Sequence, residues 1–75
     1  SIYPNPAKNE FFFFSNKSIL GKVSVEIFDA SGKLVSSQKI AATEAVNTQA
    51  LPNGVYVVKA TGLGVDYSSK LMIKK

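Results

Sequence analysis

The side chains that most often carry out chemistry in proteins are scarce in this 75-residue sequence. It has no His, Cys or Trp, and all nine of its cationic side chains are lysines. Without His the commonest general base and metal ligand is missing, and without Cys there is no thiol nucleophile, thiolate metal site or disulfide. Without Arg there is no bidentate fork for phosphate or guanine. The composition predicts a domain that is not an enzyme and that holds neither a metal nor a cofactor.

The spacing of the remaining polar residues does not change this prediction. The five carboxylates lie on separate predicted segments and lack a calcium-loop pattern; they are Glu10, Glu26, Asp29, Glu44 and Asp66. Gly62-x-Gly64 lacks a third glycine and precedes a predicted strand, which excludes a phosphate-binding loop. Asn16-Lys17-Ser18 is formally a glycosylation sequon, a triplet that is common by chance.

The formal net charge of +4 raises the question of a nucleic-acid partner. The lysines are spread along the chain, however, and the densest group is Lys70, Lys74 and Lys75. Binding of single strands usually needs exposed aromatics interleaved with cations, and only Tyr67 lies near this group. We therefore expect no nucleic-acid partner. We also expect no membrane span, because no apolar run approaches about 20 residues.

The length predicts one domain over residues 1–75, since a typical domain has roughly 100–150 residues. Because the chain begins at Ser1 without an initiator methionine, we expect it to be a fragment or processed piece of a longer protein. A domain of this length buries only about 60% of the surface that its unfolded chain exposes. The core must therefore be well packed or supported by a partner.

Alternating apolar residues predict short strands along most of the chain. The expected strands are residues 11–15, 22–29, 33–40, 55–61 and 67–73, with a short one at 46–48 that we favour over a helical turn capped by Thr43. The turn at residues 29–32 predicts a hairpin over 22–40. Pro4 and Pro6 make the opening segment stiff and unsuited to a central strand. Six or seven strands with turns at short intervals predict an antiparallel β-sandwich.

Two aromatic features refine this prediction. Tyr56 opens a strand directly after the turn at 51–54, the setting of a tyrosine corner, in which the hydroxyl bonds upstream backbone. The run Phe11-Phe12-Phe13-Phe14 must divide between two faces of a strand. We expect Phe11 and Phe13 in the core. Phe12 and Phe14 would then face outward, either covered by neighbouring segments or serving as a docking patch for a partner.

Four blocks of residues, in order, resemble a known family. They are Tyr3-Pro4-Asn5-Pro6, then Val25-x-Ile27-Phe28-Asp29-x-x-Gly32-Lys33-x-Val35, then Leu51-Pro52-x-Gly54-x-Tyr56-x-Val58-Lys59, and finally Lys70-Leu71-x-Ile73-Lys74-Lys75. The chain resembles the type A C-terminal domain of type IX secretion system cargo proteins, which occur in Bacteroidetes bacteria. The resemblance covers essentially all 75 residues, and four weak blocks at these spacings make one specific signal.

The resemblance implies an all-β, immunoglobulin-like antiparallel β-sandwich of about seven short strands. It also implies a C-terminal secretion signal that targets its parent protein for export across the outer membrane. The implied partners are the type IX translocon, an outer-membrane shuttle protein and a sortase-like peptidase that cleaves the domain. The implied location is the periplasm in transit, and then the cell surface or the medium.

The resemblance places much of the signal in the last strand, at Lys70, Leu71, Met72, Ile73, Lys74 and Lys75. A terminal strand suits strand addition, and its lysines suit an acidic partner. The same lysines could instead prevent edge-to-edge aggregation. The other motif residues are expected to be mainly structural: Tyr3, Pro4, Asn5, Pro6, Asp29, Gly32, Lys33, Leu51, Gly54 and Tyr56.

Other functions stay open from the residues alone. The chain could be a non-catalytic surface binding or adhesion module with the same fold, for a protein or a carbohydrate ligand. Carbohydrate binding would have to use Tyr3, Tyr67 and the outward phenylalanines, because Trp is absent. A homodimer through a strand edge is a further alternative.

Overall fold

The structure, a computed structural model, describes residues 2–13, 21–41, 43–62 and 65–75. Its seven strands confirm the predicted pattern. They are β1 (Ile2–Tyr3), β2 (Glu10–Phe13), β3 (Lys22–Phe28), β4 (Leu34–Ala41), β5 (Val46–Asn47), β6 (Gly54–Gly62) and β7 (Val65–Ile73). The predicted sequon at residues 16–18 lies outside the described residues.

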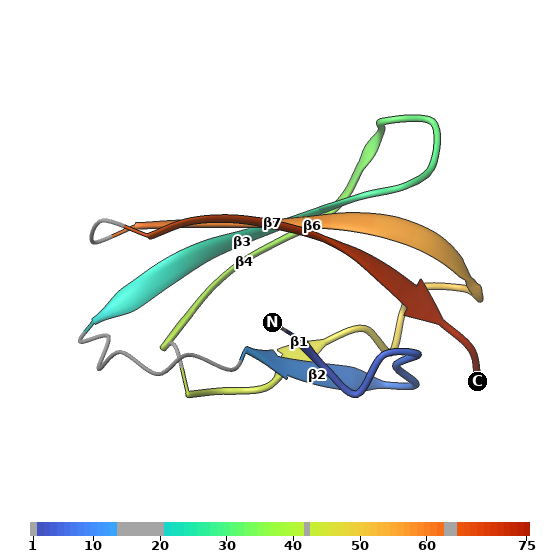
Figure 1. The fold of residues 1–75 in the computed structure, drawn as a ribbon, viewed down its shortest axis with the longest axis horizontal. Coiled ribbons are helices and arrows are strands. Elements are labelled where there is room, and N and C mark those ends of the chain that lie inside the picture. Colours follow the sequence, from blue (N-terminus) through green and yellow to red (C-terminus); the bar gives the residue numbers. More distant parts are fainter. Residues whose placement is uncertain (1, 14–20, 42, 63–64) are drawn as a thin grey trace.

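The strands form two antiparallel sheets, which confirms the predicted β-sandwich. The smaller sheet has the order β1-β2-β5, and the larger one has the order β4-β3-β6-β7. Figure 1 shows the larger sheet as one layer above the smaller one, with the end of β7 descending towards the lower layer. The last strand therefore belongs to one sheet and approaches the other.

Side chains of alternate residues fill the space between the layers. On β3, Val23, Val25 and Ile27 are buried, while the residues between them are partly exposed. This alternation follows from the two-residue period of a strand. Phe11 from the smaller sheet is fully buried against them. Full burial of a side chain of this size contributes about 1.5–3 kcal/mol to folding, so these positions define the core.

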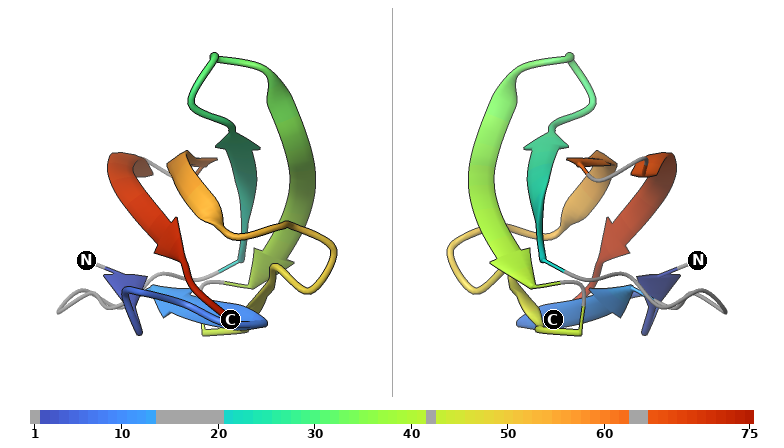
Figure 2. Two further views of the ribbon diagram at one scale, coloured as in Figure 1. Left: turned by 90° about the vertical axis from the view of Figure 1, so that its right-hand side faces the viewer. Right: turned by 90° about the vertical axis from the view of Figure 1, so that its left-hand side faces the viewer.

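The hairpin of β3 and β4 extends past the rest of the sheet. A register shift separates Ile27 from Phe28, and the chain then turns through residues 29–33. Both views in Figure 2 show this connection projecting away from the smaller sheet. Its tip is therefore remote from the last residues of the chain.

The N-terminal segment differs from the sequence prediction at Ala7. The composition of residues 7–10 predicts a polar turn, but Ala7 is fully buried. It forms an isolated parallel bridge with Ile73 at the end of β7. The Tyr3-Pro4 and Asn5-Pro6 peptide bonds that precede it are both cis. The opening segment thus lies against the last strand.

Candidate functional site

The residues predicted to carry the signal alternate between the core and the surface. Leu71 and Ile73 are buried, with exposed fractions of 0% and 2%. Lys70, Met72 and Lys74 are exposed. A partner that reads the folded domain can therefore contact only the second group. Leu71 and Ile73 hold the strand in position.

Asn5 covers the outer edge of this strand with both atoms of its amide. Its Nδ2 donates a hydrogen bond to the carbonyl oxygen of Lys70 over 3.2 Å, and its Oδ1 accepts one from the amide of Met72 over 3.0 Å. An amide side chain carries one donor group and one acceptor, which matches the alternating groups of a strand edge. The asparagine of the first motif thus acts as a substitute for a neighbouring strand.

Ala7 continues this cover towards the end of the chain. Its amide donates to the carbonyl of Met72 over 2.8 Å, and its carbonyl accepts from the amide of Lys74 over 2.9 Å. We expected a terminal strand open to strand addition. Four outward backbone groups are instead occupied by Asn5 and Ala7: the Lys70 carbonyl, both groups of Met72 and the Lys74 amide. A homodimer or a partner strand at this edge would have to displace them.

The last residue is held from the opposite side. The amide of Lys75 donates to Oδ1 of Asn53 over 3.0 Å, and its Nζ donates to the carbonyl of Gln49 over 2.8 Å. The C-terminal residues therefore lie between two segments, the opening one and the turn before β6.

The tyrosine corner fixes that turn. The hydroxyl of Tyr56 donates to the carbonyl of Pro52 over 2.6 Å, which confirms the predicted corner. Tyr56 and Leu51 are both buried. Gly54 lies against the tyrosine ring, where an added Cβ would come within 3.6 Å of it. The third motif is structural in this arrangement, and it positions the backbone that holds Lys75.

The second motif forms the tip of the β3–β4 hairpin. Oδ1 of Asp29 accepts hydrogen bonds from the Ser31 hydroxyl, the Ser31 amide and the Lys33 amide. The pKa of Asp29 lies below its ordinary value of 3.8. The main cause is the hydrogen bond from the Ser31 hydroxyl, and the two backbone amides and the nearby Lys33 charge lower the pKa further. Gly32 has a φ of 90°, a conformation that favours glycine. This turn is far from the last strand.

The phenylalanine run divides as the alternation predicts. Phe11 is in the core, and Phe13 packs against it edge to face with ring centroids 5.5 Å apart. Phe12 is only partly exposed, and the Tyr3 ring stacks on it with the ring centroids 5.7 Å apart. Phe14 lies outside the described residues. The docking patch proposed from the sequence is therefore partly covered at its one described position.

Sequence analysis missed an apolar area on the outward face of the larger sheet. Val55 and Val57 of β6 are 41% and 37% exposed, and Met72, directly opposite Val55, is 43% exposed. Lys70 lies opposite Val57. The signal was present in the sequence, because β6 has four successive apolar residues at 55–58 where a half-buried strand would alternate. One face of such a strand fills the core, and the other face is left exposed.

Metal-ligating side chains do not gather in the part of the chain that the structure describes. No group of three His, Cys, Asp or Glu side chains there could hold a metal ion. A membrane-spanning helix is likewise not found among these residues.

Comparison with known families decides the identity of the domain. Residues 1–74 match the family described as the secretion system C-terminal sorting domain. The chain belongs to this family. As a sorting domain it is the C-terminal signal of type IX secretion cargo, and its parent protein is addressed to the cell surface or the medium. An adhesion function has no support. No curated protein matches the chain.

The match covers the first three sequence blocks and all of the fourth except Lys75, and the structure gives each block a place in the sorting domain. The first block covers the edge of the last strand through Asn5, and the third holds Lys75, the last residue of the chain, through Asn53. The second forms the distant hairpin. Two of the four blocks thus converge on the fourth, which carries Lys70, Met72 and Lys74.

Proposed function

We propose that the sorting domain is a non-catalytic, folded address that the type IX machinery reads at the outward face of β7. The observation that carries this proposal is the fixed geometry of the last strand. Its edge is covered by Asn5 and Ala7, and its end is held by Asn53. A surface held in place before binding loses little conformational entropy when a partner docks.

In this proposal the contacts come from Lys70, Met72 and Lys74, together with Val55 and Val57. Met72 and the two valines offer apolar area, and the lysines favour a partner with an acidic rim. Leu71 and Ile73 act indirectly, because they anchor the strand in the core. Five of the six residues proposed from the sequence thus divide into two roles, and Lys75 is instead held by Asn53 and Gln49.

The route follows from the family. The domain would be the C-terminal unit of a larger protein that crosses the periplasm and reaches the translocon. An outer-membrane shuttle protein would then receive it, and a sortase-like peptidase would remove it at the surface.

A charge-reversal experiment tests the proposed surface. A fluorescent reporter carrying the domain is expressed in a bacterium with a type IX system, and the fraction in the medium is measured. We expect Lys70→Glu combined with Met72→Glu to reduce export about tenfold or more, because a contact loss of about 1.4 kcal/mol is tenfold in affinity.

The matched control is Lys22→Glu, at an exposed lysine at the start of β3. It changes the net charge in the same direction and should leave export near the wild-type level. Circular dichroism must show that all variants are folded. Normal export of the folded double variant would refute the proposed surface.

A further inference from the structure

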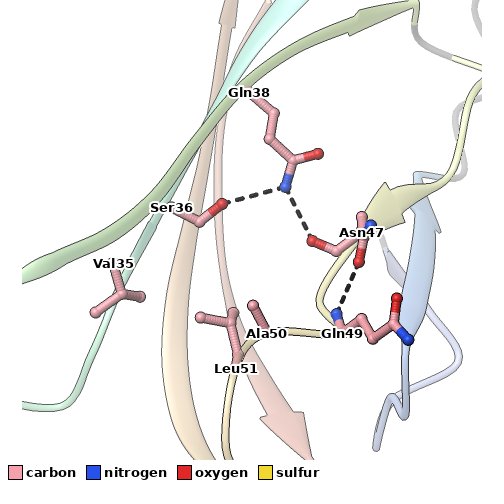
Figure 3. Close-up of a pocket in the computed structure, with 7 residues that line it drawn as sticks. All are labelled: Val35, Ser36, Gln38, Asn47, Gln49, Ala50 and Leu51. Atoms are coloured by element: carbon pink, nitrogen blue, oxygen red, sulfur yellow. Dashed lines mark hydrogen bonds between the residues drawn. The ribbon is translucent and has the colours of Figure 1, made fainter.

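A groove lies between the inner side of β4 and the segment that follows β5. Its volume is about 400 Å³, within the range of ligand-binding pockets. The residues that line it carry no charge: Val35, Ser36, Gln38, Asn47, Gln49, Ala50 and Leu51. Figure 3 shows the Gln38 amide at one wall, where its Nε2 donates to Ser36 and to the carbonyl of Asn47. This wall is therefore already ordered.

The strand beside this groove is an edge strand. β4 pairs only with β3 in the larger sheet. The amide and the carbonyl of Ala41 both point away from β3, since both bond Glu44. Backbone groups of an antiparallel strand alternate in direction with a period of two residues. Ser37 and Lys39 therefore direct their amides and carbonyls outward, and no described strand pairs with them.

These two features favour an extended peptide as the occupant. Outward backbone groups two residues apart, roughly 6.8 Å along a strand, match the repeat of another strand. Side chains of that strand opposite Gln38 would point inward, over the apolar Leu51 and Val35. A side chain opposite Lys39 would lie on the outer face, where a carboxylate is favoured.

We propose that the edge of β4 and this groove bind an extended segment of a partner protein by strand addition. The segment alternates aliphatic residues, which enter the groove, with polar or acidic residues that face Lys39. The inference rests on the proposed function in so far as the partner belongs to the secretion machinery. It also assigns strand addition to β4, because Asn5 and Ala7 occupy part of the edge of β7.

Two variants test the proposal in the export assay. Ser37→Pro removes an outward amide but no bond to β3, a change that edge strands tolerate. Ala50→Phe fills the groove from an exposed position. We expect each to reduce export about tenfold, since tenfold corresponds to only about 1.4 kcal/mol of lost binding.

Each variant has a matched control. Ser37→Ala changes the same exposed side chain but keeps the outward amide. Ala30→Phe adds the same ring at the exposed hairpin tip. Both controls should be exported like wild type. Normal export of folded Ser37→Pro and Ala50→Phe would overturn the proposal while leaving the sorting function intact, and so would equal losses in the controls.

A direct binding measurement keeps the two proposals separable. The purified domain is titrated with a synthetic heptapeptide of alternating valine and threonine with a glutamate at each end, and amide NMR spectra are recorded. We expect shifts at Ser37, Lys39 and Ala50 that Ser37→Pro abolishes. Shifts confined to other strands, or none at millimolar peptide, would count against the groove. If the wild-type reporter is not exported, the sorting function fails, and this titration still decides the strand-addition proposal.

Discussion

A single hydroxyl connects the core to the turn that holds the end of the chain. The Tyr56 hydroxyl bonds the Pro52 carbonyl from a buried ring. Tyr56→Phe keeps the ring and removes this bond. We expect a loss of about 1 kcal/mol in the free energy of unfolding, the usual net contribution of one hydrogen bond. Urea denaturation measures it. Tyr3→Phe, at a half-exposed ring, is the control, and an equal loss in both would contradict the corner's role.

The carboxylate of Asp29 gives a pH-dependent test at the hairpin tip. Its pKa lies below 3.8, chiefly because the Ser31 hydroxyl donates to it. A carboxyl group with a lowered folded-state pKa stabilises the fold above its unfolded pKa. This contribution is lost as the pH falls below about 4 and through the folded pKa. Carboxyl NMR titration should show Asp29 moving back towards its ordinary pKa in Ser31→Ala. An unchanged midpoint would exclude the hydroxyl as the main cause.

The alternation of apolar and polar residues along the chain was sufficient to predict the longer strands and their buried faces. The alternation of Val23, Val25 and Ile27 specifies which face of β3 is buried, and the structure confirms it. The role of Asn5 was not predictable in this way. Its partners lie 65 and 67 residues away, and no local periodicity encodes such a contact. The candidate site was therefore located correctly as a strand, but its covering segment was seen only in three dimensions.

The covering segment can be tested by removing one side chain. Asn5→Ala exposes the Lys70 carbonyl and the Met72 amide to water. We expect a loss of about 1–2 kcal/mol in stability, for two exposed hydrogen bonds. Hydrogen exchange should also show faster exchange of the Met72 amide. Asn9→Ala, at another exposed asparagine, should change neither quantity. Unchanged exchange at Met72 in Asn5→Ala would disprove the covering role.

For the whole molecule, the last strand is part of the core as well as a surface. A domain of this size has a stability of about 4–11 kcal/mol, at 0.05–0.15 kcal/mol per residue. Leu71→Ala should cost about 2–5 kcal/mol, because Leu71 is fully buried. Met72→Ala, on the outward face, should change stability by about 0.5 kcal/mol or less. Thermal denaturation compares them, and similar effects of both changes would contradict the described alternation.

Because the last strand contributes to both the core and the surface, a deletion of its end has two effects at once. Removing residues 71–75 would delete two core side chains, Leu71 and Ile73, along with the exposed lysines. Loss of export would then report unfolding and not loss of a recognition element. Substitutions confined to Lys70 and Met72 separate these effects, because both side chains face solvent.

The bridge between Ala7 and β7 also has a mechanical consequence. The two segments run parallel, and Ala7 bonds both Met72 and Lys74. A force that pulls the two ends of the domain in opposite directions would load these bonds in shear, so they would have to break together. The antiparallel pair β6–β7 alone, pulled at its open end, would yield one bond at a time. Single-molecule pulling should show a lower peak force in Asn5→Ala. A sorting domain under tension would thus be locked where its first and last segments meet.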